Sequence, residues 1–154
     1  MKDPMTGTVS FRTITGDKQA FLPLILEADP DPEIVGRYLD RGTLFVAYYG
    51  NEPACAAVVV PISPDEGELK ALATAIEFRH RGIASAMIRH LTETYRGRYA
   101  TLVVGTAEPG VSFYEKSGFV RFRILKDFFV ENYPAPIYDG DFLCRDMICL
   151  RKTL

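Results

Sequence analysis

The sequence predicts an α/β fold with a mixed, mostly antiparallel sheet of about seven strands and helices on both faces. The first observation is that about seven segments are either alternately or continuously apolar, as β-strands are. The second is that strand and helix patterns alternate in the second half of the chain, which implies a parallel pairing. Short turns elsewhere imply antiparallel hairpins. A length of 154 residues fits one domain, residues 1–154.

The N-terminal half combines a first strand, two helical patterns and a hairpin. Asp17 opens the first helix, whereas Pro32 begins the second and Gly42 ends it. Gly50 lies in the hairpin turn. In chain order, the predicted elements are a strand at 9–15, helices at 17–28 and 32–42, and strands at 43–50, 53–63 and 67–74.

The C-terminal half begins with an amphipathic helix that starts at Gly82. Ile83, Met87 and Leu91 recur along it at four-residue spacing, which places them on one face. The last two segments of the chain alternate and predict two long strands. The elements predicted after the helix are a buried strand at 99–106, a short helix at 109–119, and strands at 119–130 and 142–152.

Composition narrows the classes of protein. The longest apolar run, residues 54–60, is too short to cross a bilayer, and the N-terminus lacks the apolar core of a signal peptide. Cys55, Cys144 and Cys149 lie in strand-like runs without metal-ligand spacing. We expect them to be reduced core residues of a cytoplasmic protein without a metal site. The net charge of −2 argues against a nucleic-acid binder.

Basic residues crowd the start of the amphipathic helix. Arg79, His80 and Arg81 directly precede it, although a helix N-terminus already carries partial positive charge. Two misplaced exposed charges cost roughly 0.3–1 kcal/mol each in an empty helix, but they stabilise a bound phosphate. Gly82 would let such a ligand approach the backbone. A solvated basic loop is the other interpretation of this segment.

Two longer segments carry a resemblance to a known family. Residues 68–91, "ELKALATAIEFRHRGIASAMIRHL", join a strand to a helix through Arg79-x-x-Gly82-x-Ala84. Residues 112–119, "SFYEKSGF", follow after a buried strand. Together they resemble the acetyl-CoA-binding motifs of the GNAT N-acetyltransferases, and the order of elements resembles that of the GNAT fold along essentially the whole chain. The resemblance implies acetyl-CoA as co-substrate and no metal.

The resemblance also implies which residues hold the co-substrate. The strand before the helix would bind pantetheine and the acetyl carbonyl through its backbone, and the start of the helix would bind the pyrophosphate. The asparagine that often contacts CoA in the family is replaced here by Ala107-Glu108-Pro109. The implied cofactor-binding residues are Leu72, Ala73, Thr74, Arg79, His80, Arg81, Gly82, Ile83, Ala84 and Ser85.

Two catalytic residues follow from the same resemblance. Tyr114 aligns with the tyrosine that assists the departing thiolate, although it could also be a packed aromatic beside Phe113. Glu68 lies eleven residues before Arg79, where the histone-acetyltransferase branch carries its glutamate base. A substrate-orienting or solvated carboxylate is the other interpretation of Glu68, and Glu108 is the second candidate for the base.

The acceptor that the family implies is a small-molecule amine or a peptide amine, with no nucleic acid and no membrane. Residues 130–142 carry Glu131, Asp139 and Asp141 beside two tyrosines, which would suit a cationic amine. A solvated turn explains the same residues. A GNAT-fold sensor that binds CoA without turnover is the alternative function, and a homodimer through the C-terminal strands is common in the family.

Overall fold

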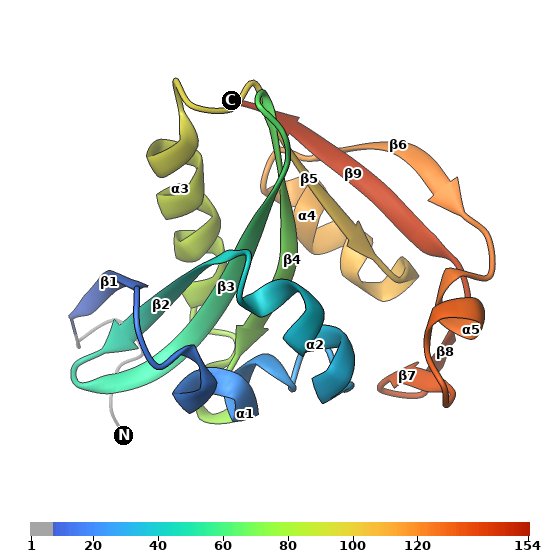
Figure 1. Ribbon diagram of the computed structural model, residues 1–154, viewed down its shortest axis with the longest axis horizontal. Coiled ribbons are helices and arrows are strands. Elements are labelled where there is room, and N and C mark those ends of the chain that lie inside the picture. Colours follow the sequence, from blue (N-terminus) through green and yellow to red (C-terminus); the bar gives the residue numbers. More distant parts are fainter. Residues whose placement is uncertain (1–7) are drawn as a thin grey trace.

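The computed structural model describes residues 8–154 and contains a seven-stranded mixed sheet with the order β1-β2-β3-β4-β5-β9-β6 (Figure 1). The N-terminal segment 1–7, where the sequence predicts no signal peptide, lies outside the described residues. The predicted sheet is confirmed, and all its pairings are antiparallel except that of β4 with β5. The strands are β1 Val9–Ile14, β2 Thr43–Tyr49, β3 Glu52–Ser63, β4 Glu66–Thr74, β5 Thr101–Thr106, β6 Val120–Leu125 and β9 Met147–Thr153. A separate hairpin pairs β7 Ile137–Asp139 with β8 Phe142–Cys144.

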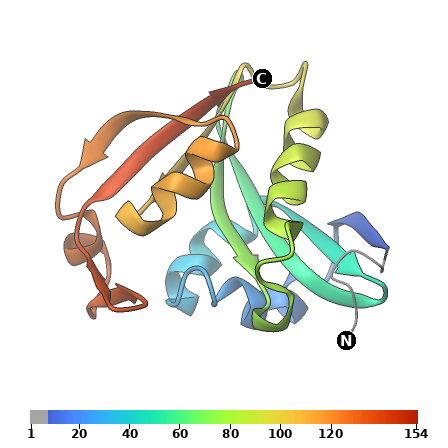
Figure 2. The same cartoon turned by 180° about the vertical axis from the view of Figure 1, so that it is seen from behind.

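Helices cover both faces of the sheet, as the sequence predicts. α1 and α2 lie over one face, whereas α3 and α4 lie over the other (Figures 1 and 2). No helix among residues 8–154 is long and apolar enough to cross a membrane. The α-helices are α1 Leu22–Ile25, α2 Pro32–Leu39, α3 Ile83–Tyr95, α4 Val111–Lys116 and α5 Phe128–Asn132.

Side chains of the central strands alternate between two apolar clusters over most of their length. Cys55, Ala57 and Val59 of β3 pack in the cluster that includes α3, whereas Val58 and Val60 pack in the cluster that includes α2. Because successive side chains of a strand point to opposite faces, a continuous apolar run is needed when both faces are covered. The three cysteines are buried and free, as predicted for core residues.

The sheet opens between β4 and β5. These parallel strands are paired only from Glu66 opposite Thr101 to Leu69 opposite Val104. A bulge lies at Lys70, since Val59 pairs with Leu69 and Val58 with Ala71. Bulges redirect side chains and often lie beside functional sites. Beyond Leu69, β4 continues to Thr74 along β3 while β5 continues along β9, so the two strands diverge (Figure 1).

The helix predicted at 17–28 is wrong in its extent. The structure has a 3₁₀ turn at Lys18–Phe21, followed by the single-turn helix α1. Pro23 lies in the first turn of α1, where its missing N–H costs nothing, so it begins a new turn. Asp17 has a left-handed backbone with φ 49° and makes no side-chain cap among the described residues.

The two long C-terminal strands are also wrong as predicted. The first ends at Leu125 and is followed by α5, and the second is divided into β8 and β9. The Asp127 amide donates to Oδ1 of Asp146 at 2.9 Å, and Arg145 pairs with Asp127 at 3.0 Å. These contacts bring the two breaks together and turn the chain at both, which alternation alone does not reveal.

Candidate active site

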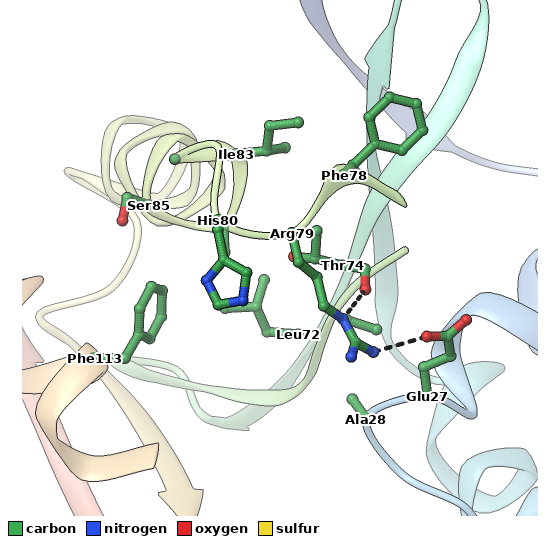
Figure 3. Close-up of a pocket in the computed structure, with 13 residues that line it drawn as sticks. Glu27, Ala28, Leu72, Thr74, Phe78, Arg79, His80, Ile83, Ser85 and Phe113 are labelled. Atoms are coloured by element: carbon green, nitrogen blue, oxygen red, sulfur yellow. Dashed lines mark hydrogen bonds and ion pairs between the residues drawn. The ribbon is translucent and has the colours of Figure 1, made fainter. Parts of the chain in front are cut away.

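A first cavity of about 440 Å³ lies between the start of α3 and the end of β4 that does not pair with β5. Phe113 of α4 also lines it, and the side chains of His80, Arg79 and Phe113 point into it (Figure 3). The structure therefore brings together all of the sequence-predicted cofactor residues except Arg81. Those that line the cavity are Leu72, Ala73, Thr74, Arg79, His80, Gly82, Ile83, Ala84 and Ser85.

The first turn of α3 presents its backbone to this cavity. Gly82 is the N-cap with φ 79°, and within residues 8–154 no side chain caps this helix end. His80 also has a positive φ of 62°, so the loop turns sharply before the helix. The uncapped N–H groups and the helix dipole together form an anion site. A pyrophosphate bound here would not compete with a side-chain cap for these N–H groups.

The two arginines beside the helix start are held differently. Arg79 donates from Nε to the Thr74 carbonyl at 3.1 Å and from a terminal nitrogen to Glu27 at 2.8 Å (Figure 3). It therefore joins the end of β4 to the segment that follows α1. The Arg81 guanidinium lies over the rings of Phe78 at 5.6 Å and Tyr49 at 6.0 Å, and it does not line the cavity.

Tyr114 packs edge-on against two phenylalanines of its own segment. The ring centroids of Phe113 and Phe119 lie 5.0 and 5.5 Å away. Burial raises the pKa of Tyr114 well above its usual value, and the nearby Cys55 adds to this shift. The phenol therefore keeps its proton and is a hydrogen-bond donor. Phe113 lines the first cavity, whereas Tyr114 is packed against the adjoining core.

Cys55 does not qualify as an acetyl-accepting nucleophile. Burial raises its pKa to about 11, and the hydrogen bond from the Thr74 hydroxyl at 3.7 Å offsets this only in part. The reactive form of a cysteine is the thiolate, so this thiol is inert at neutral pH. The raised pKa of this buried thiol therefore argues against a covalent acetyl-cysteine step.

A second cavity of about 310 Å³ lies where β4 and β5 diverge, between α2 and α5. Glu68 lines it and pairs with Lys70 at 3.8 Å, with about a quarter of the Glu68 side chain exposed. Glu108 lines neither this cavity nor the first and pairs with Arg121 at 3.3 Å. The residues lining the second cavity are Asp29, Ile34, Arg37, Tyr38, Arg41, Glu68, Leu69, Lys70, Gly105, Phe128, Asn132, Tyr133 and Met147.

Asp29 is one of the residues of this cavity that sequence reasoning missed. Its carboxylate is buried and accepts hydrogen bonds at 2.9 Å from the hydroxyls of both Tyr38 and Tyr133. Burial, followed by the charge of Asp29, raises the pKa of both tyrosines. Asp29 belongs to a short acidic, proline-rich break, "ADPDP", which gives no local signal of a site.

The acidic loop at residues 130–142 lines the second cavity through a tyrosine and an asparagine and not through its carboxylates. Glu131, Asp139 and Asp141 are exposed and do not line the second cavity. Tyr133 does line it, together with Phe128 and Asn132 of α5.

Comparison with known proteins identifies the class. The model of the acetyltransferase (GNAT) domain matches residues 40–121. The N-acetyltransferase YvbK of Bacillus subtilis is 31% identical over 135 residues, which cover 85% of this chain and 87% of that protein.

Solved structures agree with this match over nearly the whole chain. A GNAT family acetyltransferase from Elizabethkingia anophelis with acetyl-CoA bound has a TM-score of 0.90 and 32% identity, covering 95% of this chain and 98% of that one. An IAA acetyltransferase from Bacillus cereus has a TM-score of 0.87 and 31% identity, covering 96% and 100%. A Bacillus subtilis acetyltransferase in complex with CoA has a TM-score of 0.86 and 26% identity, covering 96% and 99%.

The fold, the open pair of strands and these relatives define an acyltransferase enzyme. The chain belongs to the GNAT superfamily of N-acetyltransferases, as the sequence motifs predict. Acetyl transfer to an amine is the general reaction of this class.

Proposed function

We propose that this protein transfers the acetyl group of acetyl-CoA to a primary amine by direct attack on the thioester. The observation that carries the proposal is the position of the two cavities along β4. Leu72 lines one and Lys70 the other, so the cavities are two residues apart on the end of β4 that does not pair with β5. A co-substrate in the first cavity and an acceptor in the second would meet at the opening between the strands.

The first cavity would hold acetyl-CoA through the residues implied by the family motif. The backbone of His80 to Ser85 would bind the pyrophosphate, with Arg79 supplying charge at the cavity wall and Arg81 from outside it. The backbone of Leu72, Ala73 and Thr74 would bind the pantetheine arm. The uncapped α3 terminus and the small residues of its first turn support this arrangement.

The chain's own residues would then move the protons. Glu68 takes one proton from the ammonium of the acceptor, whose nitrogen then attacks the carbonyl carbon. The backbone N–H near Leu72 stabilises negative charge on the carbonyl oxygen. As the new C–N bond forms and the C–S bond breaks, Tyr114 donates a strengthening hydrogen bond to sulfur, which leaves as the thiolate and then takes a proton from solvent. The amide nitrogen releases its second proton to solvent.

The degree of proton transfer from Tyr114 follows from its burial. A thiol has a reference pKa of about 8.5, so an ordinary phenol near 10 is already the weaker acid. The raised pKa of Tyr114 in the free enzyme makes full transfer more unfavourable. A hydrogen bond with partial transfer is therefore the role we assign to it.

Release of free thiol from acetyl-CoA in the presence of an amine panel tests this function. Turnover with at least one primary amine, together with mass-spectrometric detection of the acetylated amine, is the expected result. Acetyl-CoA binding by calorimetry with no acetylated product for any amine would instead support the CoA-binding sensor.

A further inference from the structure

The charges of the second cavity do not match those of a site for a simple cationic amine. Its lining contains more cationic side chains than carboxylates. The cations are Arg37, Arg41 and Lys70, and the carboxylates are Asp29 and Glu68. Asp29 is already engaged by two tyrosine hydroxyls, which leaves Glu68, itself 3.8 Å from the Lys70 ammonium, as the carboxylate that an acceptor ammonium group would approach. A polyamine would therefore meet more repulsion than attraction here.

The two arginines lie one turn apart at the end of α2. Arg41 donates from Nε to the Arg37 carbonyl at 3.3 Å, which holds the two side chains at the same edge of the cavity. Arg37 pairs with Glu33 at 3.5 Å, but both of these side chains are largely exposed, so this pair contributes little. Like charges at this spacing repel each other until an anion lies between them. Guanidinium groups bind the oxygens of carboxylates and phosphates in a bidentate manner.

The remaining walls indicate how the acceptor would lie. Glu68 is on β4 beside the strand opening, where the attacking amine is required, whereas Arg37 lies on α2 and Arg41 directly follows its C-cap. Phe128 and Met147 add apolar surface on the side of α5 and β9. The Tyr133 hydroxyl holds the α5 side of the cavity against Asp29 at 2.9 Å, so the cavity is formed before the acceptor arrives.

From this arrangement we propose that the acceptor is a small primary amine that also carries an anionic oxygen group, either a carboxylate or a phosphate ester. The amine faces Glu68, and the anionic group binds Arg41 and Arg37. Lys70 of β4 adds a further positive charge to the cavity. This assignment rests on the proposed N-acetyltransferase function and names the substrate class of the same site. It makes Arg37 and Arg41 specificity-determining residues for the reaction.

Matched pairs of amines test the assignment, with spermidine as a polyamine for comparison. The pairs are phenylalanine with 2-phenylethylamine and O-phosphoethanolamine with ethanolamine, and each differs by one anionic group. We expect kcat/KM to be about tenfold or more higher for the anionic member of at least one pair, as charge-assisted hydrogen bonds imply. Which pair responds distinguishes a carboxylate from a phosphate. Added salt should reduce the preference because these arginines are exposed.

Arg41→Gln should raise KM for the anionic amine by about tenfold and leave kcat and the neutral amine unchanged. Arg89→Gln, at an exposed position on α3, is the matched control and should leave the preference intact. A lower melting temperature of Arg41→Gln with unchanged KM would show that Arg41 only stabilises the end of α2, and would overturn the assignment.

The remaining outcomes separate this inference from the proposed function. Turnover of spermidine or of the neutral amines without any preference for an anionic partner would overturn the acceptor class but leave N-acetyl transfer in place. Absence of thiol release with every amine of the panel would overturn both.

Discussion

The hydroxyl of Tyr133 donates a 2.9 Å hydrogen bond to Oδ1 of Asp29, which lies 104 residues earlier in the chain. The other carboxylate oxygen accepts a 2.9 Å bond from the Tyr38 hydroxyl. One buried carboxylate therefore joins the segment after α1, helix α2 and the end of α5. Because all three residues line the second cavity, this network connects folding stability with the shape of the site.

Asp29→Asn should weaken both hydrogen bonds, because the tyrosines would lose a charged acceptor. We expect the free energy of unfolding to fall by about 1–3 kcal/mol. KM for the acceptor should rise, whereas acetyl-CoA affinity should hold, since the first cavity is separate. Urea unfolding and calorimetry measure the two effects.

Asp31→Asn is the control for this variant. Asp31 caps α2 by accepting hydrogen bonds from the amides of Glu33 and Ile34, and asparagine caps a helix about as well as aspartate. Both stability and KM should therefore be unchanged. Equal effects of the two substitutions would remove Asp29 from any role in the second cavity.

The network also predicts how stability depends on alkaline pH. Burial, and then Asp29, raise the pKa of Tyr38 above its usual value near 10. Above pH about 10 the unfolded chain loses this proton while the folded protein keeps it. The contribution of Tyr38 to stability is therefore complete below pH about 10 and is lost as pH rises above it, by up to about 1.4 kcal/mol per pH unit.

Unfolding in urea at several values between pH 8 and 11 measures this slope. Tyr38→Phe should reduce this slope above pH about 10, because no phenol then titrates at this position, whereas Tyr133 and Tyr114 still contribute. Tyr138→Phe, at an exposed tyrosine, should leave the slope as in the parent. Identical slopes for the parent and Tyr38→Phe would contradict the prediction.

That residues 72–74 and 79–85 lie together could be predicted from the sequence because they are local in the chain, and all of them except Arg81 line the first cavity. Residues 72–85 form the end of one strand, one loop and the start of one helix, so their separation along the chain is enough to predict that they lie together. The second cavity combines residues from α2, β4, β5, α5 and β9, and no spacing in the chain records that Asp29 meets Tyr133. Glu68 was identified only because the family motif contains its position.

The fold likewise divides into strands that local sequence patterns predict and strand ends that depend on contacts between distant segments. Alternation predicted the central strands, since their side chains meet the two apolar clusters in turn. It failed after Leu125 and between Cys144 and Met147, where the predicted strands run on but the Asp127 amide binds Asp146 from the next segment. A long-range hydrogen bond there decides where the strands end.

The proposed anion site at the start of α3 can be tested with a substitution that should raise the stability of the protein and lower its affinity for acetyl-CoA. Ser85→Asp places a negative charge in the first helical turn, which should stabilise the protein by about 0.3–1 kcal/mol. The same charge would repel a pyrophosphate, so acetyl-CoA affinity should fall about tenfold or more. Ser85→Asn should change neither by much. Unchanged affinity in Ser85→Asp would show that the pyrophosphate lies elsewhere.

Glu68 and Glu108 can be separated as candidate bases. Glu68→Gln should lower kcat/KM by about 10²–10⁴-fold, most at low pH where free amine is scarcest, with acetyl-CoA affinity nearly unchanged. Glu108→Gln should leave the pH profile as in the parent, because Glu108 pairs with Arg121 and lines neither cavity. A parental profile in Glu68→Gln would make Glu68 a bystander and return the role to water or Glu108.

Tyr114→Phe distinguishes an enzyme from a sensor. The ring contacts with Phe113 and Phe119 should survive, so the melting temperature should stay close to that of the parent. Acetyl-CoA affinity should also hold, since the proposed binding groups are the backbone of residues 72–74 and 80–85. What should fall is kcat, because the hydroxyl is needed mainly when charge develops on sulfur. Contributions of this type reach about 10²–10⁴-fold.

The leaving group provides a second measurement on the same variant. A loss of kcat together with kcat/KM indicates an interaction made only in the transition state. The loss should be large with acetyl-CoA and smaller with an acetyl thioester whose thiol is more acidic, because that sulfur needs less help to leave. If kcat were unchanged while single-turnover kinetics showed chemistry to be rate-limiting, Tyr114 would be a core aromatic.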